Sequence, residues 1–305
     1  MKCAIVTGAS GLIGKALTKK LLENGVEVWA VSRTGTALRR LACDKLHIIT
    51  TSFQNYGCLP ELIHHRGFDV LFHFAWGGYA TASDDYKVQM DNIIASCAIA
   101  GAASELGVNR FIFADSSHEF LQIENGQKRA GPSNIYGSAK LCARVMCQAI
   151  THSQGIEFLG ALFINVFGVG DMTMRSVNQI LLKLSRDEPL NLIDAERKYS
   201  WTYVDDCVHG VLCAAERGKS GKIYYVGQPL QPFSEIIEKA RDVVGSSSTL
   251  NFGAYHDSAE IDYSKIDFSA LKTDTDFQCN CDFQDSVLKT VQYLKSELNY
   301  NMEEM

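Results

Sequence analysis

The feature that most constrains this chain is a set of three glycines near its N-terminus, which lies between two segments of different character. Residues 3–7 form a short apolar stretch typical of a buried strand, and residues 15–23 carry apolar side chains at helical spacing. The glycines between them are Gly8, Gly11 and Gly14. Because residues 26–31 indicate a second strand, the sequence predicts a strand–helix–strand unit with the glycines at its first turn.

A glycine-rich turn at the start of a helix is an arrangement that binds phosphate. One glycine permits the tight turn, one lets backbone N–H groups approach a pyrophosphate, and one lets the helix pack closely on the strand. The positive end of the helix then faces the negative phosphates. We therefore expect a dinucleotide at this loop, in contact with Gly8, Ser10, Gly11, Leu12, Ile13 and Gly14.

Composition excludes several other classes of protein. The chain has 305 residues, of which 46% are hydrophobic, and this is too apolar for a disordered chain. Lys and Arg number 29 against 35 Asp and Glu, without a basic stripe, so no nucleic-acid partner is expected. No apolar run reaches the ~18 residues of a membrane span, and the apolar N-terminus lacks a cleavage site. We expect a cytoplasmic chain with no membrane segment.

The ten cysteines are scattered singly, apart from Cys279 and Cys281, and form no C-x-x-C pair. This pattern favours free thiols in a reducing compartment over a disulfide framework. No histidine and no second cysteine pair stands near Cys279 and Cys281, so we expect no metal site.

The end of the second predicted strand bears on the choice of cofactor. A site selective for NAD usually has Asp or Glu here to bind the ribose 2′-hydroxyl. This chain has Ser32 and Arg33 instead, and Arg39 and Arg40 follow closely. Since a guanidinium pairs well with a phosphate, the sequence favours NADP(H), with NAD(H) as the alternative.

Tyr136 and Lys140 are four residues apart in a predicted helix that continues to about residue 150, so both side chains lie on one face. An ammonium beside a phenol favours the phenolate and lowers the pKa of the tyrosine from its usual ~10. Tyr136 can then exchange a proton with a carbonyl or an alcohol. About twenty residues earlier, the apolar strand 108–114 leads into Ser116 and Ser117. A hydroxyl at this end of a parallel strand can orient the reacting oxygen.

Together these segments resemble the extended short-chain dehydrogenase/reductases, the NAD(P)-dependent epimerase/dehydratase enzymes of nucleotide sugars. The segments that carry the resemblance are 7–14, 69–76, 111–117, 136–140, 165–170 and 201–206. The resemblance implies that Ser116, Tyr136 and Lys140 are catalytic, and that Lys140 also binds the nicotinamide ribose. It implies further cofactor contacts at Ser52, Phe53, Phe74, Ala75, Trp76, Asn92 and Phe163, and substrate contacts at Ser116, Ser117, His118, Tyr136, Asn165 and Arg175.

The chain departs from the family pattern at several places, and two of these bear on the cofactor and on the reaction. Ser52 stands where the family usually has the aspartate that touches adenine, which puts that contact in doubt. Ser117 and His118 replace the Asp-Glu pair of the family's sugar 4,6-dehydratases. Because that pair carries out the elimination, the departure disfavours 4,6-dehydration.

Strand and helix patterns alternate to about residue 165, which predicts an α/β fold with a Rossmann-like, doubly wound parallel sheet. We expect residues 1–170 to form the dinucleotide-binding domain, with the catalytic residues. Residues 171–305 are expected to form mainly a smaller substrate-binding lobe, with some segments returning to the sheet. Within this lobe the spacing predicts helices over 176–185 and 233–244, the second ending at Gly245.

These observations lead to one favoured function and two alternatives. We expect an NADP(H)-dependent reductase of a nucleotide-linked 4-keto-6-deoxy sugar, with hydride transfer at C4 and Tyr136 as proton donor. The first alternative is a nucleotide-sugar 4-epimerase with tightly bound NAD, and the less favoured one is a non-catalytic dinucleotide-binding regulator. The resemblance also implies a homodimer formed through the helices that carry Tyr136 and Asn92.

Overall fold

The computed structural model describes residues 1–79, 81–120, 132–256 and 261–303. The chain forms two compact units. The first unit comprises Met1–Phe163, Val208–Val226 and Ile261–Phe277, and the second comprises Ile164–Cys207, Gly227–Glu260 and Gln278–Met305. The C-terminal half of the chain therefore returns to the first unit twice.

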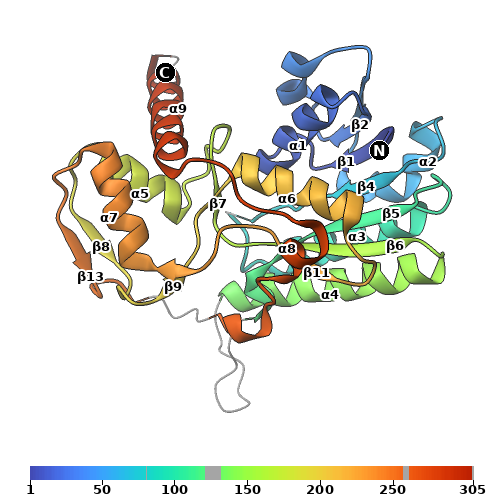
Figure 1. The fold of residues 1–305 in the computed structure, drawn as a ribbon. Coiled ribbons are helices and arrows are strands. Elements are labelled where there is room, and N and C mark those ends of the chain that lie inside the picture. Colours follow the sequence, from blue (N-terminus) through green and yellow to red (C-terminus); the bar gives the residue numbers. More distant parts are fainter. Residues whose placement is uncertain (80, 121–131, 257–260, 304–305) are drawn as a thin grey trace. The chain divides into compact units, whose positions relative to one another are not determined.

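A seven-stranded sheet forms the centre of the first unit (Figure 1). The strand order is β11-β6-β5-β4-β1-β2-β3, and all neighbouring strands are parallel. The order reverses between β1 and β4, which is where doubly wound sheets bind ligands. The predicted Rossmann-like sheet is confirmed. Its strands are β1 (Cys3–Thr7), β2 (Glu27–Ser32), β3 (Leu46–Thr50), β4 (Val70–His73), β5 (Arg110–Ser116), β6 (Glu157–Phe163) and β11 (Ile223–Tyr225).

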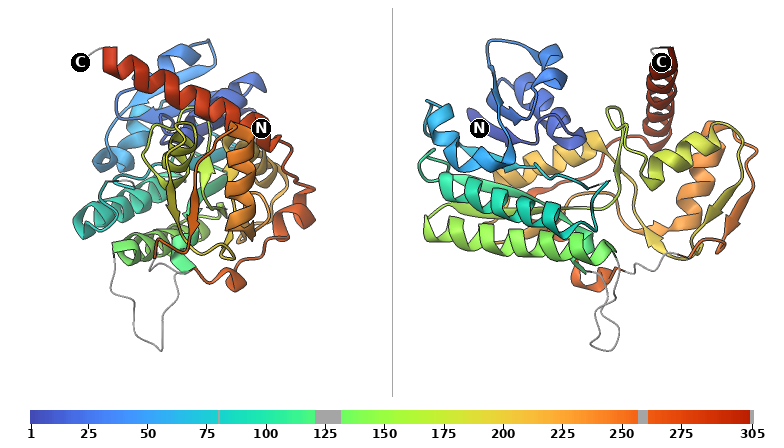
Figure 2. Two further views of the ribbon diagram at one scale, coloured as in Figure 1. Left: turned by 90° about the vertical axis from the view of Figure 1, so that its left-hand side faces the viewer. Right: turned by 180° about the vertical axis from the view of Figure 1, so that it is seen from behind.

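Helices cover both faces of this sheet. On one face α3 (Tyr86–Ala102) and α4 (Pro132–Ser153) lie side by side, and on the other lie α1 (Leu12–Glu23) and α6 (Val204–Arg217) (Figure 2). The core between the sheet and the α3–α4 pair is rich in aromatic and aliphatic side chains, including Phe68, Phe111 and Ile99. Shorter helical elements connect these parts: η1 (Thr36–Leu41), η2 (Phe53–Cys58), α2 (Leu59–Leu62), η3 (Ser117–Phe120), η4 (Tyr263–Lys265) and α8 (Ala270–Thr275).

Within its described residues, the second unit contains three small pairs of strands and three helices that lie wholly inside it. The strands β7 (Val166–Phe167) and β10 (Thr202–Tyr203) pair in parallel, as do β8 (Leu190–Leu192) and β13 (Leu250–Phe252), whereas β9 (Lys198–Tyr199) and β12 (Gln231–Pro232) are antiparallel. The helices are α5 (Ser176–Leu184), α7 (Phe233–Val244) and α9 (Phe283–Glu303). The first two confirm the predicted helices, and α7 ends at Gly245, whose φ of 70° is left-handed.

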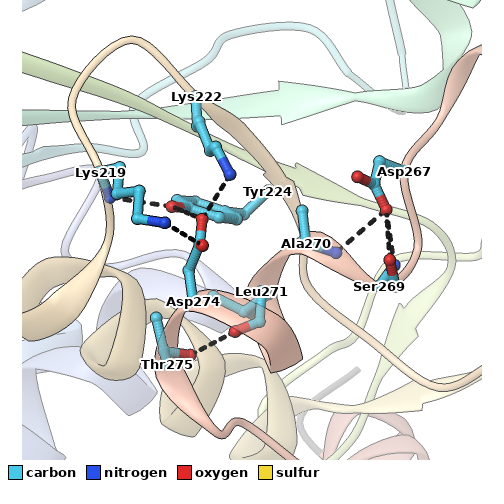
Figure 3. A network of polar contacts seen from close by, with 9 residues as sticks. All are labelled: Lys219, Lys222, Tyr224, Asp267, Ser269, Ala270, Leu271, Asp274 and Thr275. Atoms are coloured by element: carbon cyan, nitrogen blue, oxygen red, sulfur yellow. Dashed lines mark hydrogen bonds and ion pairs between the residues drawn. The ribbon is translucent and has the colours of Figure 1, made fainter.

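A cluster of charged residues attaches α8 to the edge of the central sheet (Figure 3). The Asp274 carboxylate accepts hydrogen bonds from Lys219 Nζ (2.6 Å), Lys222 Nζ (2.5 Å) and the hydroxyl of the buried Tyr224 (2.8 Å). These hydrogen bonds hold the pKa of Asp274 well below its usual value. The returning segment is thereby held against β11, the outermost strand of the sheet.

No helix in the part of the chain that the structure describes is both long enough and apolar enough to cross a membrane.

Candidate functional site

The glycine loop brings three backbone segments into direct contact. Gly8 has a φ of +69°, and a Cβ placed on it would lie 2.6 Å from the backbone of Phe74 and Ala75, which follow β4. A Cβ on Gly14, in the first turn of α1, would lie 2.2 Å from the Gly8 carbonyl oxygen. Only glycine permits this packing, which sets the start of α1 directly above the ends of β1 and β4. The first-turn amides of α1 have no acceptor within the helix.

His73 fastens β4 to its neighbours. Its Nδ1 lies 2.8 Å from Thr7 Oγ1 on β1, and its Nε2 lies 2.9 Å from Ser96 Oγ on α3. Burial lowers the pKa of His73 to about 3, with a smaller contribution from the charge of Lys140. The imidazole is therefore neutral near pH 7 and serves as a hydrogen-bonded link between three elements.

Asn92 holds the segment that follows β4. Its Oδ1 accepts from the Gly77 N–H (2.7 Å) and its Nδ2 donates to the Gly77 carbonyl (2.9 Å). Trp76 Nε1 donates to Gln89 Oε1, also on α3 (2.9 Å). Among the other expected cofactor contacts on this side, Ala75 is buried, Phe74 is half-buried, and its ring lies 6.0 Å from that of Phe163. Asn92 therefore positions the backbone after β4 through hydrogen bonds inside the protein.

The end of β2 presents cations at the surface. Ser32 is buried, and its Oγ accepts from the Gly35 N–H (3.1 Å), so this hydroxyl stabilises the turn. Arg33 is exposed, as are Arg39 and Arg40 in η1. The positive charge of Arg33 acts on the buried Tyr56 hydroxyl, whose pKa burial nevertheless raises. Ser52, before η2, is exposed, and Phe53 is half-buried with its ring 5.5 Å from that of Tyr56.

Tyr136 lies among aromatic rings at the carboxyl end of the sheet. The side chain is buried, and its ring stands perpendicular to that of Trp76 at 6.0 Å and nearly perpendicular to that of His118 at 5.4 Å. The following residue, Gly137, lets η3 approach α4, because a Cβ there would lie 2.2 Å from the His118 carbonyl oxygen. The hydroxyl residues Ser116 and Ser117 are buried beside His118, whose N–H donates to Ser116 Oγ (3.3 Å).

Lys140 lies one helical turn after Tyr136 and is buried. Its Nζ donates to the carbonyl of Ala114 on β5 (2.9 Å) and lies 3.8 Å from the centre of the Trp76 ring. Burial lowers the pKa of Lys140 to about 7, although nearby carboxylates oppose this effect. The structure therefore places Tyr136, Lys140 and Trp76 together beside the end of β5.

A buried charge cluster next to Lys140 was not predicted from the sequence. Arg144, one turn further along α4, has its Nε 2.8 Å from Asp115 Oδ2 and 3.0 Å from Glu119 Oε2. Two features of the sequence could have indicated this cluster. Arg144 follows Lys140 by four residues, and Asp115 follows the apolar residues of β5.

The two remaining candidates lie in the second unit. Asn165 has a left-handed φ of 43°, and its carbonyl accepts from the Thr202 N–H (3.2 Å). Arg175 Nη2 lies 2.5 Å from Asp171 Oδ2, and its Nε donates to Thr173 Oγ1 (2.8 Å). The guanidinium is thus engaged by residues of its own loop.

Comparison with known proteins bears on the family and the fold of this chain. Residues 4–227 match the model of the NAD dependent epimerase/dehydratase family. A UDP-glucose epimerase described as uncharacterized, YtcB of Bacillus subtilis, is 22% identical over 278 residues, which are 81% of this chain and 84% of that protein. UDP-glucuronic acid decarboxylase 1 of Xenopus tropicalis is 26% identical over 326 residues, covering 98% of this chain and 73% of that protein.

Solved structures of similar fold include two complexes. The Bordetella bronchiseptica enzyme WbmF with NADH has a TM-score of 0.80 at 17% identity, over 99% of this chain and 94% of that one. UDP-glucuronic acid 4-epimerase of Bacillus cereus, with UDP-glucuronic acid and NAD, has a TM-score of 0.79 at 20% identity, over 97% and 99% of the two chains. Because the family model matches residues 4–227, most of its length, the chain belongs to the NAD dependent epimerase/dehydratase family.

Proposed function

We propose that this chain is an oxidoreductase that reduces a nucleotide-linked 4-keto-6-deoxy sugar at C4 with NADPH. The observation that carries the catalytic part is the buried group of Tyr136, Lys140 and Ser116 at the carboxyl end of β5. Tyr136 would donate its proton to the carbonyl oxygen as the carbon is reduced. Ser116 would orient that oxygen, and the ammonium of Lys140 would favour loss of the Tyr136 proton.

The glycine loop fits a dinucleotide. Close backbone contacts leave no room for a side chain at Gly8 or Gly14. The backbone of the loop and the first turn of α1 therefore form the surface that a pyrophosphate would meet. Trp76 and Ala75, held by α3 through Asn92 and Gln89, would line the nicotinamide side. When bound, the nicotinamide supplies the hydride.

The preference for NADPH rests on Arg33. It is exposed directly after β2, with Arg39 and Arg40 exposed in the next element, where a 2′-phosphate would find guanidinium partners. A cofactor drawn from the reduced cellular pool suits net reduction of a substrate, whereas an epimerase regenerates its own bound cofactor.

The test is a direct assay of reduction. Purified protein is mixed with NADPH and a nucleotide-linked 4-keto-6-deoxy sugar, and the reduced-nicotinamide absorbance is followed. We expect Tyr136→Phe to lower turnover by roughly 10²-fold or more while dinucleotide binding is kept. The matched control is Tyr255→Phe, which makes the same change at a 58% exposed tyrosine. Unchanged turnover in Tyr136→Phe would refute the mechanism, and binding without turnover in any sugar would favour a regulator.

A nucleotide-sugar 4-epimerase with tightly bound NAD is the second candidate. The relatives and solved structures named above favour it, since they include a protein named as a UDP-glucose epimerase and a 4-epimerase bound to NAD. The same three side chains would serve this reaction. Conversion of a sugar nucleotide into its C4 epimer without added cofactor, and without net oxidation of NADPH, would establish this function in place of reduction.

We also propose that the chain forms a homodimer through α3 and α4. Large apolar side chains are exposed in a stripe along α3 at Tyr86, Met90 and Ile94, and beside them along α4 at Leu141 and Val145. Exposed apolar side chains gathered on two adjacent helices are typical of an interface. Ile94→Glu should yield a monomer by light scattering after gel filtration, whereas Leu288→Glu, at a 44% exposed leucine of α9, should not.

A further inference from the structure

Four buried ionisable side chains meet where α4 packs on the end of β5. The side chains of Asp115 on β5 and Glu119 on η3 are 0% and 1% exposed, and that of Arg144 is 11% exposed. Lys140 is buried one turn before Arg144 on the same face of α4, with its Nζ bonded to the carbonyl of Ala114, the residue before Asp115. Charges removed from water in this way are tolerated only when they compensate one another.

The charges in this cluster do not balance without Lys140. Arg144 Nε stands within 3.0 Å of both carboxylates, so one cation is shared between two anions. When both carboxyl groups are ionised, the three side chains carry a net charge of about −1. Burial, together with the charge of Glu119, raises the pKa of Asp115 to about 7, and the positive charges of Arg144 and Lys140 act in the opposite direction. The ammonium of Lys140 restores neutrality, and the negative charges of Asp115 and Glu119 both favour its protonated form.

Two other titratable groups near Lys140, His73 and Cys147, supply no further negative charge. On β4, His73 is kept neutral by burial. On α4, contact with Cys97 and burial raise the pKa of the Cys147 thiol, which therefore stays protonated. Tyr136 precedes Lys140 by one turn, and His118 of η3 lies against the Tyr136 ring. Within the part of the chain that the structure describes, the groups whose negative charge would favour the protonated form of Lys140 are Asp115, Cys147 and Glu119, and of these the Cys147 thiol stays neutral.

We propose that Asp115 and Glu119, joined through Arg144, are positioning residues that keep Lys140 protonated in its buried place beneath Trp76. This inference rests on the proposed role of Lys140 beside Tyr136. The cluster acts through Lys140 and touches neither the substrate nor the cofactor. Its consequence is that the upper pH limit of the reaction is set by two buried carboxyl groups that pair with Arg144.

Glu119→Gln tests this proposal because it removes one charge and keeps the shape of the side chain. The titration of Lys140 is followed by NMR in full-length protein labelled with ¹³C at the lysine Cε, and its signal is assigned by its absence from Lys140→Met. We expect the pKa of Lys140 to fall by about one unit or more. Asp115→Asn should move it in the same direction, which keeps the test usable if one variant folds poorly.

The matched control is Glu157→Gln. Glu157 also pairs with an arginine, Arg110, but at the opposite end of β5 and with its side chain 50% exposed. This control should leave the titration of Lys140 unchanged. In the reductase assay, the alkaline limb of kcat/KM against pH should shift to lower pH in Glu119→Gln and not in Glu157→Gln.

The two readouts separate the inference from the proposed function. A Lys140 titration that is the same in wild type, Glu119→Gln and Asp115→Asn would overturn the inference even if the enzyme is active. A shifted titration in a protein that turns over no sugar nucleotide would support the charge cluster and refute the proposed function.

Discussion

Gly14 offers the sharpest test of how this fold builds its glycine loop. In Gly14→Ala the new Cβ would lie 2.2 Å from the Gly8 carbonyl oxygen and 2.8 Å from the Gly8 carbonyl carbon. Ordinary contact begins near 3.4 Å, so the overlap is about 1.2 Å. Both atoms belong to a backbone that is itself pressed against Phe74 and Ala75. The methyl group can be accommodated only if α1 moves away from β1.

The expected change in the free energy of unfolding of Gly14→Ala follows from two opposing effects. Overpacking a well-packed site typically costs about 1–3 kcal/mol, and the rigid neighbours here place Gly14→Ala near the top of that range. Replacing a helical glycine with alanine contributes up to about 1 kcal/mol in the other direction. We expect a net loss of about 2 kcal/mol in the free energy of unfolding. For a chain of 305 residues the melting temperature should fall by roughly 3 °C.

Gly11→Ala is the matched control, since it adds the same methyl group three residues earlier. Gly11 has an ordinary φ of −76°, and the nearest atom to its added Cβ lies 3.4 Å away. We expect its stability to stay within about 1 kcal/mol of the wild type. Urea unfolding followed by circular dichroism measures both variants. Equal stabilities for Gly14→Ala and Gly11→Ala would refute the argument that backbone contact requires glycine at position 14.

Three further predictions concern charge. Arg33→Ala should weaken NADPH binding about tenfold or more with little effect on NADH, measured by calorimetry, because a charge-assisted bond to the 2′-phosphate is lost; an equal effect on both cofactors would contradict the proposed NADPH site. Asp274 has a lower pKa in the folded than in the unfolded protein, so its carboxylate contributes stability above about pH 4 that is lost as the pH falls further. Asp274→Asn should therefore have a lower free energy of unfolding in urea than wild type at pH 7, and the difference between the two proteins should be smaller at pH 3. The same difference at both pH values would argue against the contacts of Asp274 with Lys219 and Lys222. The pKa of His73 is about 3 in the folded protein and 6.5 in the unfolded chain. Between these two pH values the unfolded chain binds a proton at His73 and the folded protein does not, so the free energy of unfolding falls as the pH is lowered from 6.5 to 3. In His73→Gln the free energy of unfolding, measured in urea, should depend less on pH over this interval. An unchanged slope of this free energy against pH would show that other groups cause the dependence.

Local patterns predicted the parts of this fold that depend on neighbouring residues. The strand, glycine turn and helix of residues 3–23 follow from side-chain spacing, and α7 ends at Gly245 because glycine readily adopts the left-handed conformation. The return of residues 261–277 to the first unit depends on Asp274 meeting Lys219 and Lys222, which are more than fifty residues away. No local pattern encodes such a pairing.

The candidate site likewise has features that follow from local sequence and features that depend on tertiary packing. The four-residue spacing of Tyr136 and Lys140 is a local property, and it places both side chains on one face of α4. The environment of Lys140 depends on Asp115 and Glu119, whose distances from Arg144 are fixed only when α4 packs on β5. Similarly, an asparagine in a helix gives no sign that its amide will bind the backbone of Gly77.

The late return of β11 has a practical consequence for anyone who wishes to study the dinucleotide-binding unit alone. β11 pairs with residues 160–162 of β6, and it is reached only after the chain has passed through much of the second unit. A fragment that stops at residue 163 would leave that stretch of β6 as an open, apolar edge, the kind of surface that recruits strands from other molecules. A usable fragment must instead bypass the second unit and rejoin the chain near residue 208, with the segment around α8 supplied as well.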